Sequence, residues 1–278
     1  MSATDVRSAT GERLDALAGG DDPRAALIGY LPVGYPSVDG SARAVRTMIE
    51  AGVDIVELGV PYTDPVMDGP VIQAAANHAL AQGTRVQHTL QVAEQVADAG
   101  APVLVMTYWN LVLRYGVDAF ARDLASAGGA GLITPDLVPE EGADWIAAAE
   151  AHGLDRVFLV APSSSPERLA STVAASRGFV YAASTMGVTG ERATVGDRAE
   201  QLVADTRAAG AARVCVGLGV SRPEQAAQVA RYADGVIVGS ALVRALLEAP
   251  DERSGLDALA GVVDGLAHGV RTARRPAP

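Results

Sequence analysis

The chain has 278 residues, of which 49% are hydrophobic and only 4% aromatic, so its core must be built mainly from Ala, Val, Leu and Ile. Its net charge of −11 argues against a nucleic-acid partner, because binding to a phosphate backbone depends on clustered cations. All 22 basic residues are arginine, and without a lysine amine no Schiff base can form on this chain, either with a substrate carbonyl or with pyridoxal phosphate.

The first residues of the chain are polar. Residues 1–23 resemble neither a signal peptide nor a membrane span, and no later apolar run is long enough to cross a bilayer, so we expect a cytoplasmic protein with no membrane partner. Residues 10–18 are predicted to form a short helix that plugs the amino-terminal face of the fold. Residues 274–278 are expected to be a loose tail.

Short apolar runs alternate with amphipathic segments along the whole chain. The predicted strands are 26–31, 54–60, 103–107, 131–134, 156–160, 179–183, 213–217 and 235–238. The predicted helices include 38–51, 86–99, 117–127, 140–152, 166–175, 198–209, 223–232 and 241–248. Eight strands, each followed by a helix, favour parallel pairing and an α/β fold, a single (β/α)8 barrel over residues 1–278 with a short extra amino-terminal helix. A doubly wound open sheet is the alternative.

Local signals support these boundaries. Pro166 fits the first turn of one helix, and residues 221–224 resemble a capping box that opens another. The single cysteine, Cys215, lies in an apolar run and is expected to be a small buried residue.

Glu57 is an ionisable residue inside the second predicted strand. It shares one side of that strand with Ile55 and Gly59, whereas the other side is entirely apolar and belongs under the helices. We therefore expect Glu57 to point into the barrel near its carboxyl end, where poor solvation would raise its pKa and suit it to general acid catalysis. A buried Glu paired with an arginine or a hydroxyl is the alternative.

Asp68 follows in the loop after that strand, immediately before a Gly-Pro step that opens the next helix. Its position allows two interpretations. The carboxylate could face the same cavity as Glu57, or it could serve as a helix cap or turn residue, and Asp64 carries the same ambiguity.

Glycines follow the last three predicted strands, in residues 187–190, 217–221 and 239–240. Backbone amides at the last loops of a barrel, together with a short helix start, often hold a phosphate group. A metal site is not expected, because the four histidines, His78, His88, His152 and His268, all fall in helical stretches without ligand spacing.

Seven dispersed motifs together resemble one known family, that of the tryptophan synthase α subunit. They are residues 29–36, 57–70, 106–110, 135–141, 184–190, 217–221 and 238–240. The resemblance implies a (β/α)8 barrel that cleaves indole-3-glycerol phosphate into indole and glyceraldehyde 3-phosphate, a step in tryptophan biosynthesis.

The resemblance also implies roles for individual residues. Glu57 would be the catalytic acid and base, Asp68 would bind the indole N–H, and Tyr181 would line the same catalytic site. The phosphate-binding positions would be Gly190, Gly219, Gly239 and Ser240, with Thr189 helping to close the site and Tyr108 and Leu218 in the indole pocket. The chain departs from the family pattern at Leu218, often Phe, at Val138, often Pro, and at Met67, usually a small residue.

The family's usual partner is a β subunit that carries pyridoxal phosphate, in an α2β2 assembly. For this chain the resemblance implies no cofactor of its own, with Asp64, Asn110 and residues 136–141 as contacts to that partner. The alternatives are a free-standing indole-3-glycerol-phosphate lyase, a mainly regulatory subunit that activates a partner, and a phosphosugar epimerase or aldolase on the same fold.

Overall fold

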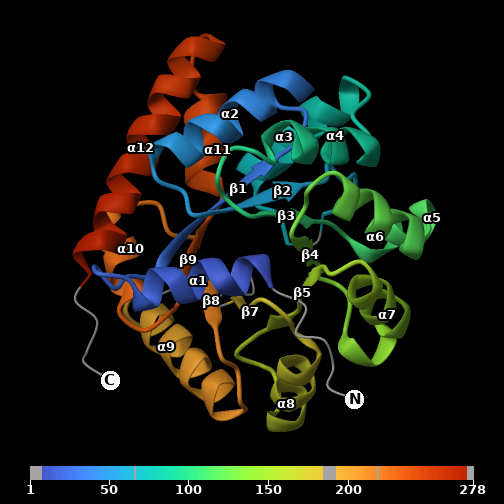
Figure 1. Ribbon diagram of the computed structural model, residues 1–278. Coiled ribbons are helices and arrows are strands. Elements are labelled where there is room, and N and C mark those ends of the chain that lie inside the picture. Colours follow the sequence, from blue (N-terminus) through green and yellow to red (C-terminus); the bar gives the residue numbers. More distant parts are fainter. Residues whose placement is uncertain (1–7, 66, 184–191, 218, 274–278) are drawn as a thin grey trace.

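A ring of parallel strands occupies the centre of the computed structural model, and helices surround it (Figure 1). The structure describes residues 8–65, 67–183, 192–217 and 219–273. Its strands are β1 (Ala26–Pro32), β2 (Ile55–Gly59), β3 (Val103–Met106), β4 (Gly131–Ile133), β5 (Asp155–Val157), β6 (Leu159–Val160), β7 (Val180–Ala183), β8 (Val214–Gly217) and β9 (Gly235–Val238).

The order of the strands closes the ring. Within the described residues, nine parallel strands pair in the order β5-β4-β3-β2-β1-β9-β8-β7-β6. The two strands at the ends of this order, β5 and β6, are separated only by Phe158, so they are two pieces of one predicted strand. The predicted (β/α)8 barrel is therefore confirmed, the open-sheet alternative is wrong, and the run predicted at 156–160 is split by one residue.

The helices lie between the strands as predicted, with several additions. They are α1 (Ala9–Gly19), α2 (Val38–Ala51), α3 (Pro70–Ala81), α4 (Val86–Val96), α5 (Trp109–Tyr115), α6 (Val117–Ser126), the 3-10 helix η1 (Pro139–Glu141), α7 (Ala143–Ala151), α8 (Pro166–Ala175), α9 (Arg192–Ala208), α10 (Pro223–Ala230), α11 (Ser240–Leu247) and α12 (Glu252–Thr272). The helix predicted at 140–152 is divided at Gly142, which ends η1 and precedes α7. No helix within the described ranges is long and apolar enough to span a membrane.

Strand periodicity separates two layers of the core. The interior of the barrel contains one buried residue or more from each of several strands: Ala26, Ile28, Ile55, Leu104, Ile133, Val157, Cys215 and Ile237. The opposite side of β2, with Val56 and Leu58, packs in the layer beneath the helices. Alternate residues of β2 therefore face inward, as predicted, and Cys215 is a buried free thiol of the interior.

Both predicted helix starts are confirmed, but the predicted capping box at the second is wrong. Pro166 lies in the first turn of α8, and the hydroxyl of Ser165 accepts a hydrogen bond from the backbone N–H of Arg168. The helix α10 begins at Pro223 as predicted, but the predicted capping box of residues 221–224 is wrong, because the N-cap residue is Arg222. The side chain that caps it is Gln225, which accepts the backbone N–H groups of Ser221 and Arg222 at 3.0 and 3.1 Å.

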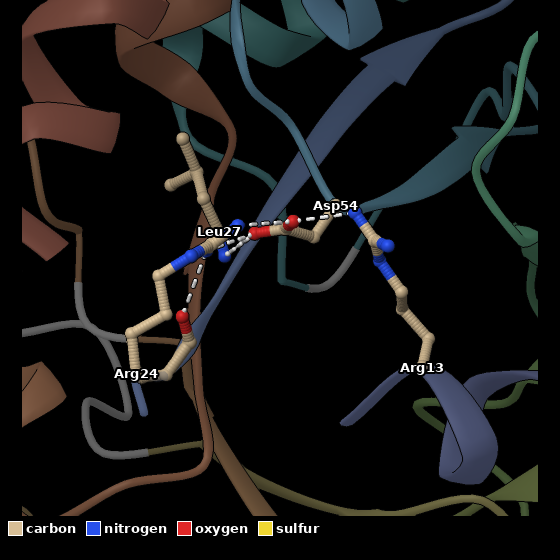
Figure 2. A network of polar contacts seen from close by, with 5 residues as sticks. Arg13, Arg24, Leu27 and Asp54 are labelled. Carbon is tan, nitrogen blue, oxygen red and sulfur yellow. Dashed lines mark hydrogen bonds and ion pairs between the residues drawn. The ribbon is translucent and has the colours of Figure 1, made fainter. Parts of the chain in front are cut away.

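The helix α1 lies across the amino-terminal end of the barrel, as predicted (Figure 1). Figure 2 shows how it is attached there: Arg13 of α1 donates to the buried carboxylate of Asp54 at 2.8 Å. Arg24 donates to the same carboxylate at 2.6 and 2.8 Å, and the backbone N–H of Leu27 does so at 2.9 Å. Each oxygen of Asp54 therefore receives two hydrogen bonds.

A second buried carboxylate holds the first turn of α1. Asp155 accepts the backbone N–H of Thr10 at 3.0 Å and its hydroxyl at 2.6 Å, while Arg177 lies 3.6 Å away. Arg213 pairs with Asp15 of the same helix. The amino-terminal end of the barrel is thus closed by a network of paired charges.

Candidate active site

Glu57 lies on the inward side of β2, and its side chain is completely buried. Among the residues that the structure describes, neither of its carboxyl oxygens has a hydrogen-bond partner. Burial raises the pKa of Glu57 to about 8, because the charged form is poorly solvated there. The pairing alternative from the sequence is thus not seen in the described residues, and the carboxyl group holds a proton at neutral pH.

Two tyrosines lie close to this carboxyl group. Tyr30 of β1 is the register partner of Glu57, and Tyr181 of β7 lies on the inward side of its own strand. Burial raises the pKa of both phenols well above the usual range, and the nearby charges of Glu57 and Asp68 raise it further. Both phenols therefore lie near both carboxyl groups, toward the carboxyl ends of the strands.

Each tyrosine ring lies over a glycine of the neighbouring strand. A side chain at Gly59 would collide with the hydroxyl of Tyr30, and one at Gly217 would collide with the hydroxyl of Tyr181. The glycines therefore give the phenols room to extend across the barrel mouth. Tyr30 is not among the site residues predicted from the sequence, although it shares the parity of the buried Ile28 and faces Glu57 in register.

Asp68 lies in the loop between β2 and α3. The residue that precedes α3 is Gly69, no side chain caps this helix start, and so the interpretation of Asp68 as a helix cap is wrong. Partial burial raises the pKa of Asp68. Its backbone carbonyl accepts a hydrogen bond from the side-chain amide of Gln73 at 2.7 Å, which fixes the end of the loop.

Tyr108, the residue before α5, supports the same loop from the other side. Its hydroxyl accepts the backbone N–H of Met67 at 3.1 Å, and its ring lies 4.7 Å from the ring of Tyr62. Tyr108 is buried, whereas Met67 is 42% exposed. The expected indole-pocket residue is thus attached directly to the backbone beside Asp68.

The predicted phosphate positions lie at the ends of the last two strands. Gly219 follows β8 with a φ of +63°, Gly239 directly precedes α11, and Ser240 is the first residue of that helix. Within the described ranges no side chain caps the start of α11. Gly239 also lies against the ring of Tyr30. Thr189, Gly190 and Leu218 lie outside the described residues.

The remaining predicted residues surround this site. Asp64 is exposed and accepts the hydroxyl of Thr63, while Asn110 donates to the hydroxyl of Tyr62 at 3.1 Å. The residues 136–141 begin with an aspartate, Asp136, whose carboxylate accepts the backbone N–H of Trp109 at 2.9 and 3.1 Å. The described residues contain no group of three or more candidate metal ligands.

The chain matches the family model described as "Tryptophan synthase alpha chain" over residues 19–270. It is 62% identical over 253 residues to the tryptophan synthase alpha chain of Mycobacterium ulcerans (strain Agy99), which covers 91% of this chain and 92% of the relative. The corresponding protein of Mycobacterium tuberculosis (strain ATCC 25177 / H37Ra) is 61% identical over 248 residues, covering 89% and 90%.

Solved structures give the same result. A tryptophan synthase structure from M. tuberculosis in space group F222 aligns with a TM-score of 0.88 at 58% identity, covering 95% of this chain and 98% of that one. The tryptophan synthase subunit alpha of Legionella pneumophila str. Paris aligns with a TM-score of 0.86 at 29% identity, covering 95% and 98%. With a matching barrel, a matching family model and close relatives along nearly its whole length, the chain belongs to the tryptophan synthase alpha chain family.

Proposed function

We propose that this chain cleaves indole-3-glycerol phosphate into indole and glyceraldehyde 3-phosphate, with Glu57 as the proton donor to the ring and Asp68 as the acceptor of the indole N–H. This cleavage is the reaction of tryptophan synthase alpha chains, which are carbon–carbon lyases. The observation that carries the assignment of roles is the fully buried Glu57 carboxyl group, whose pKa is raised to about 8.

The bond can break only if the indole ring accepts electrons. Protonation of ring carbon C3 by Glu57 places positive charge on the ring nitrogen. The hydroxyl of the side chain next to the ring then loses its proton while its carbon becomes the aldehyde carbon. The electron pair of the broken carbon–carbon bond returns to the ring and restores its aromaticity, so one proton enters at carbon and one leaves at oxygen. Glu57, once deprotonated, is available to accept the second proton.

Two carboxyl groups in different surroundings suit two different roles. Glu57 is completely buried and protonated, so it can donate a proton. Asp68 is only partly buried and lies on a loop, so in our proposal it remains ionised and stabilises the charge on the ring nitrogen. Tyr181 and Tyr30 line the space between them and exclude water. The tyrosine hydroxyls, with raised pKa values, remain neutral hydrogen-bond donors.

The phosphate group of the substrate would lie at the start of α11. Gly239 and Ser240 supply backbone N–H groups there, and Gly219 lies at the end of the neighbouring β8. These amides and the positive end of the helix dipole hold an anion without a lysine, which this chain lacks. In our proposal Gly190 and Thr189, from the loop after β7, complete this side of the site, and Leu218 borders the indole ring with Tyr108.

The proposed partner is a tryptophan synthase β subunit, in an α2β2 assembly. Support comes from the family and from the similarity to a tryptophan synthase of M. tuberculosis. The contacts would be made by Asp64, Asn110 and residues 136–141, on the face that carries Asp68. We propose no cofactor on this chain, with pyridoxal phosphate on the partner only, and one barrel domain that acts in the cytoplasm.

The test is an indole-release assay on indole-3-glycerol phosphate with the purified chain, with and without a β subunit. We expect indole in both arms, and faster release with the β subunit. Equal rates in the two arms would identify a free-standing lyase. Absence of indole in both arms would contradict the proposed function. Turnover of the β subunit that rises in the presence of this chain, without any cleavage by the chain, would identify a regulatory subunit.

A further inference from the structure

The loop that carries Asp68 is held by a tyrosine hydroxyl. Tyr108 accepts the backbone N–H of Met67, the residue directly before Asp68, at 3.1 Å. On the far side of Asp68, Gln73 donates to the Asp68 carbonyl at 2.7 Å. The Asp68 carboxylate itself has no hydrogen bond within the described part of the chain. Its place in the site is therefore set through the backbone on either side.

Tyr62 fixes the ring that makes the first of these contacts. The two ring centroids lie 4.7 Å apart at an interplanar angle of 31°, a tilted arrangement that restricts the side-chain rotation of Tyr108. Tyr62 is held in turn by the side-chain amide of Asn110, which donates to its hydroxyl at 3.1 Å. Tyr62 is half-buried and Asn110 is exposed, so a continuous set of contacts leads from the surface to Asp68.

From this geometry we propose that Tyr62 is a positioning residue for Asp68, acting through the ring of Tyr108 and the backbone of Met67. The inference rests on the proposed role of Asp68 at the indole nitrogen. A carboxylate that stabilises a developing charge must be placed within about half an ångström of its productive position. Loss of the Tyr62 ring leaves Tyr108 free to turn away from Met67. The effect of such a change appears mainly in kcat, because the phosphate-binding groups at Gly239 and Ser240 are untouched, and the movement of Tyr108 beside the indole ring changes KM to a smaller extent.

The test compares two substitutions of Tyr62. Tyr62→Ala removes both the ring contact and the hydroxyl, and we expect kcat to fall about 10- to 100-fold, with KM within about threefold of the wild-type value. Tyr62→Phe keeps the ring and loses only the contact with Asn110, and should retain most of kcat. Tyr115→Ala is the control, because it removes an aromatic contact with Phe120 at 5.8 Å and the hydrogen bond from the Tyr115 hydroxyl to Asp123 at 2.7 Å, away from the Asp68 loop, and it should leave kcat unchanged. Thermal unfolding of each variant shows that it is folded.

The decisive measurement adds Asp68→Asn, alone and combined with Tyr62→Ala. If Tyr62 acts through Asp68, the double variant is no slower than Asp68→Asn alone, which we expect to lose about 100-fold in kcat. A double variant whose loss equals the product of the two single losses would overturn the positioning role while leaving the proposed function intact. A wild-type rate for Asp68→Asn would overturn both the positioning role of Tyr62 and the proposed role of Asp68 at the indole nitrogen. A Tyr62→Ala variant that changes KM alone would also overturn the positioning role.

Discussion

At one end of the barrel a buried carboxylate is fully hydrogen-bonded, and at the other end a buried carboxyl group has no partner within the described residues. Asp54, just before β2, and Glu57, in β2, are the two examples. Asp54, just before β2, is 2% exposed and receives four hydrogen bonds from Arg13, Arg24 and Leu27. Glu57, three residues later, is completely buried and receives none within the described residues.

The difference separates stability from catalysis. Burying a charge costs free energy unless other groups pair with it. At the amino-terminal end this cost is offset by arginines and backbone N–H groups, and the carboxylates join α1 to the barrel. At the carboxyl-terminal end the cost is not offset, so the proton stays on Glu57 and is available for transfer. In barrels of this kind the carboxyl-terminal face generally carries the catalytic residues, whereas the amino-terminal face contributes to stability.

The largest expected effect tests the catalytic end. Glu57→Gln keeps the size and burial of the side chain but cannot donate a proton, so kcat for indole release should fall about 10²- to 10⁴-fold. Because Glu57 makes no hydrogen bond that the substitution removes, the melting temperature should not fall. An unchanged rate at saturating substrate would contradict the assignment of Glu57 as the acid.

The next effect is a dependence of stability on pH. In the folded chain the pKa of Glu57 is raised to about 8 from an ordinary value of 4.5, so between these pH values the folded state binds one more proton than the unfolded state. The contribution of Glu57 to the free energy of unfolding should therefore be highest below pH 4.5, fall through this window by an amount on the order of 4–5 kcal/mol, and level off above pH 8.

This effect is measured as the difference in unfolding free energy between the wild-type chain and Glu57→Gln. Denaturant unfolding of the wild-type chain and of Glu57→Gln at pH 5 and pH 8.5 cancels the contributions of all other titrating groups. Glu57→Gln should be the more stable of the two chains at pH 8.5, by more than it is at pH 5. A gap between the two that stays constant with pH would show that Glu57 is not held protonated by burial.

A substitution at the amino-terminal end should show the reverse pattern. Asp54→Asn removes the negative charge with which Arg13 and Arg24 both pair, and we expect a loss of about 2–4 kcal/mol in unfolding free energy. This is less than the full cost of an unpaired buried charge, because the arginine side chains are 36% and 19% exposed and can reach solvent. The kcat of the folded protein should stay near the wild-type value. A large fall in kcat without a loss of stability would contradict the separation of the two ends.

The smallest effect concerns the second attachment of α1. Thr10→Val removes the hydroxyl that donates to Asp155 at 2.6 Å but keeps the backbone N–H contact at 3.0 Å, so the loss should be about 1–2 kcal/mol. Chemical denaturation of Thr10→Val beside Thr10→Ser, which keeps the hydroxyl, measures it. Equal stability of the two variants would show that this hydroxyl does not hold the helix.

The sequence predicted the barrel because each of its signals is local. Apolar runs mark strands wherever both faces are buried, and the parity of Glu57 against Val56 and Leu58 is visible in five residues. The split of the fifth strand at Phe158 carries no local signal. The capping box at α10 is displaced by one residue from the predicted one, because a glutamate and a glutamine stand side by side and either could cap the helix.

The parts that sequence did not predict depend on distant pairings. Asp54 is the first residue of the strand predicted at 54–60, and its arginine partner in α1 lies 41 positions away in the sequence. Tyr30 has the same apolar neighbours as any strand residue, and its closeness to the site follows only from pairing of β1 with β2. Asp68 could have been a cap until the structure assigned that position to Gly69.

The contacts that attach α1 to the barrel determine when this helix can dock during synthesis and folding of the chain. The helix leaves the ribosome first, but the partners of Thr10 and Asp15 lie 145 and 198 residues further along the chain. It therefore cannot be secured until β5 and β8 have been synthesised and placed, and closure over such separations is slow. Hydrogen exchange at the amide of Thr10 would then report completion of the ring, since that amide becomes protected only when Asp155 is in position.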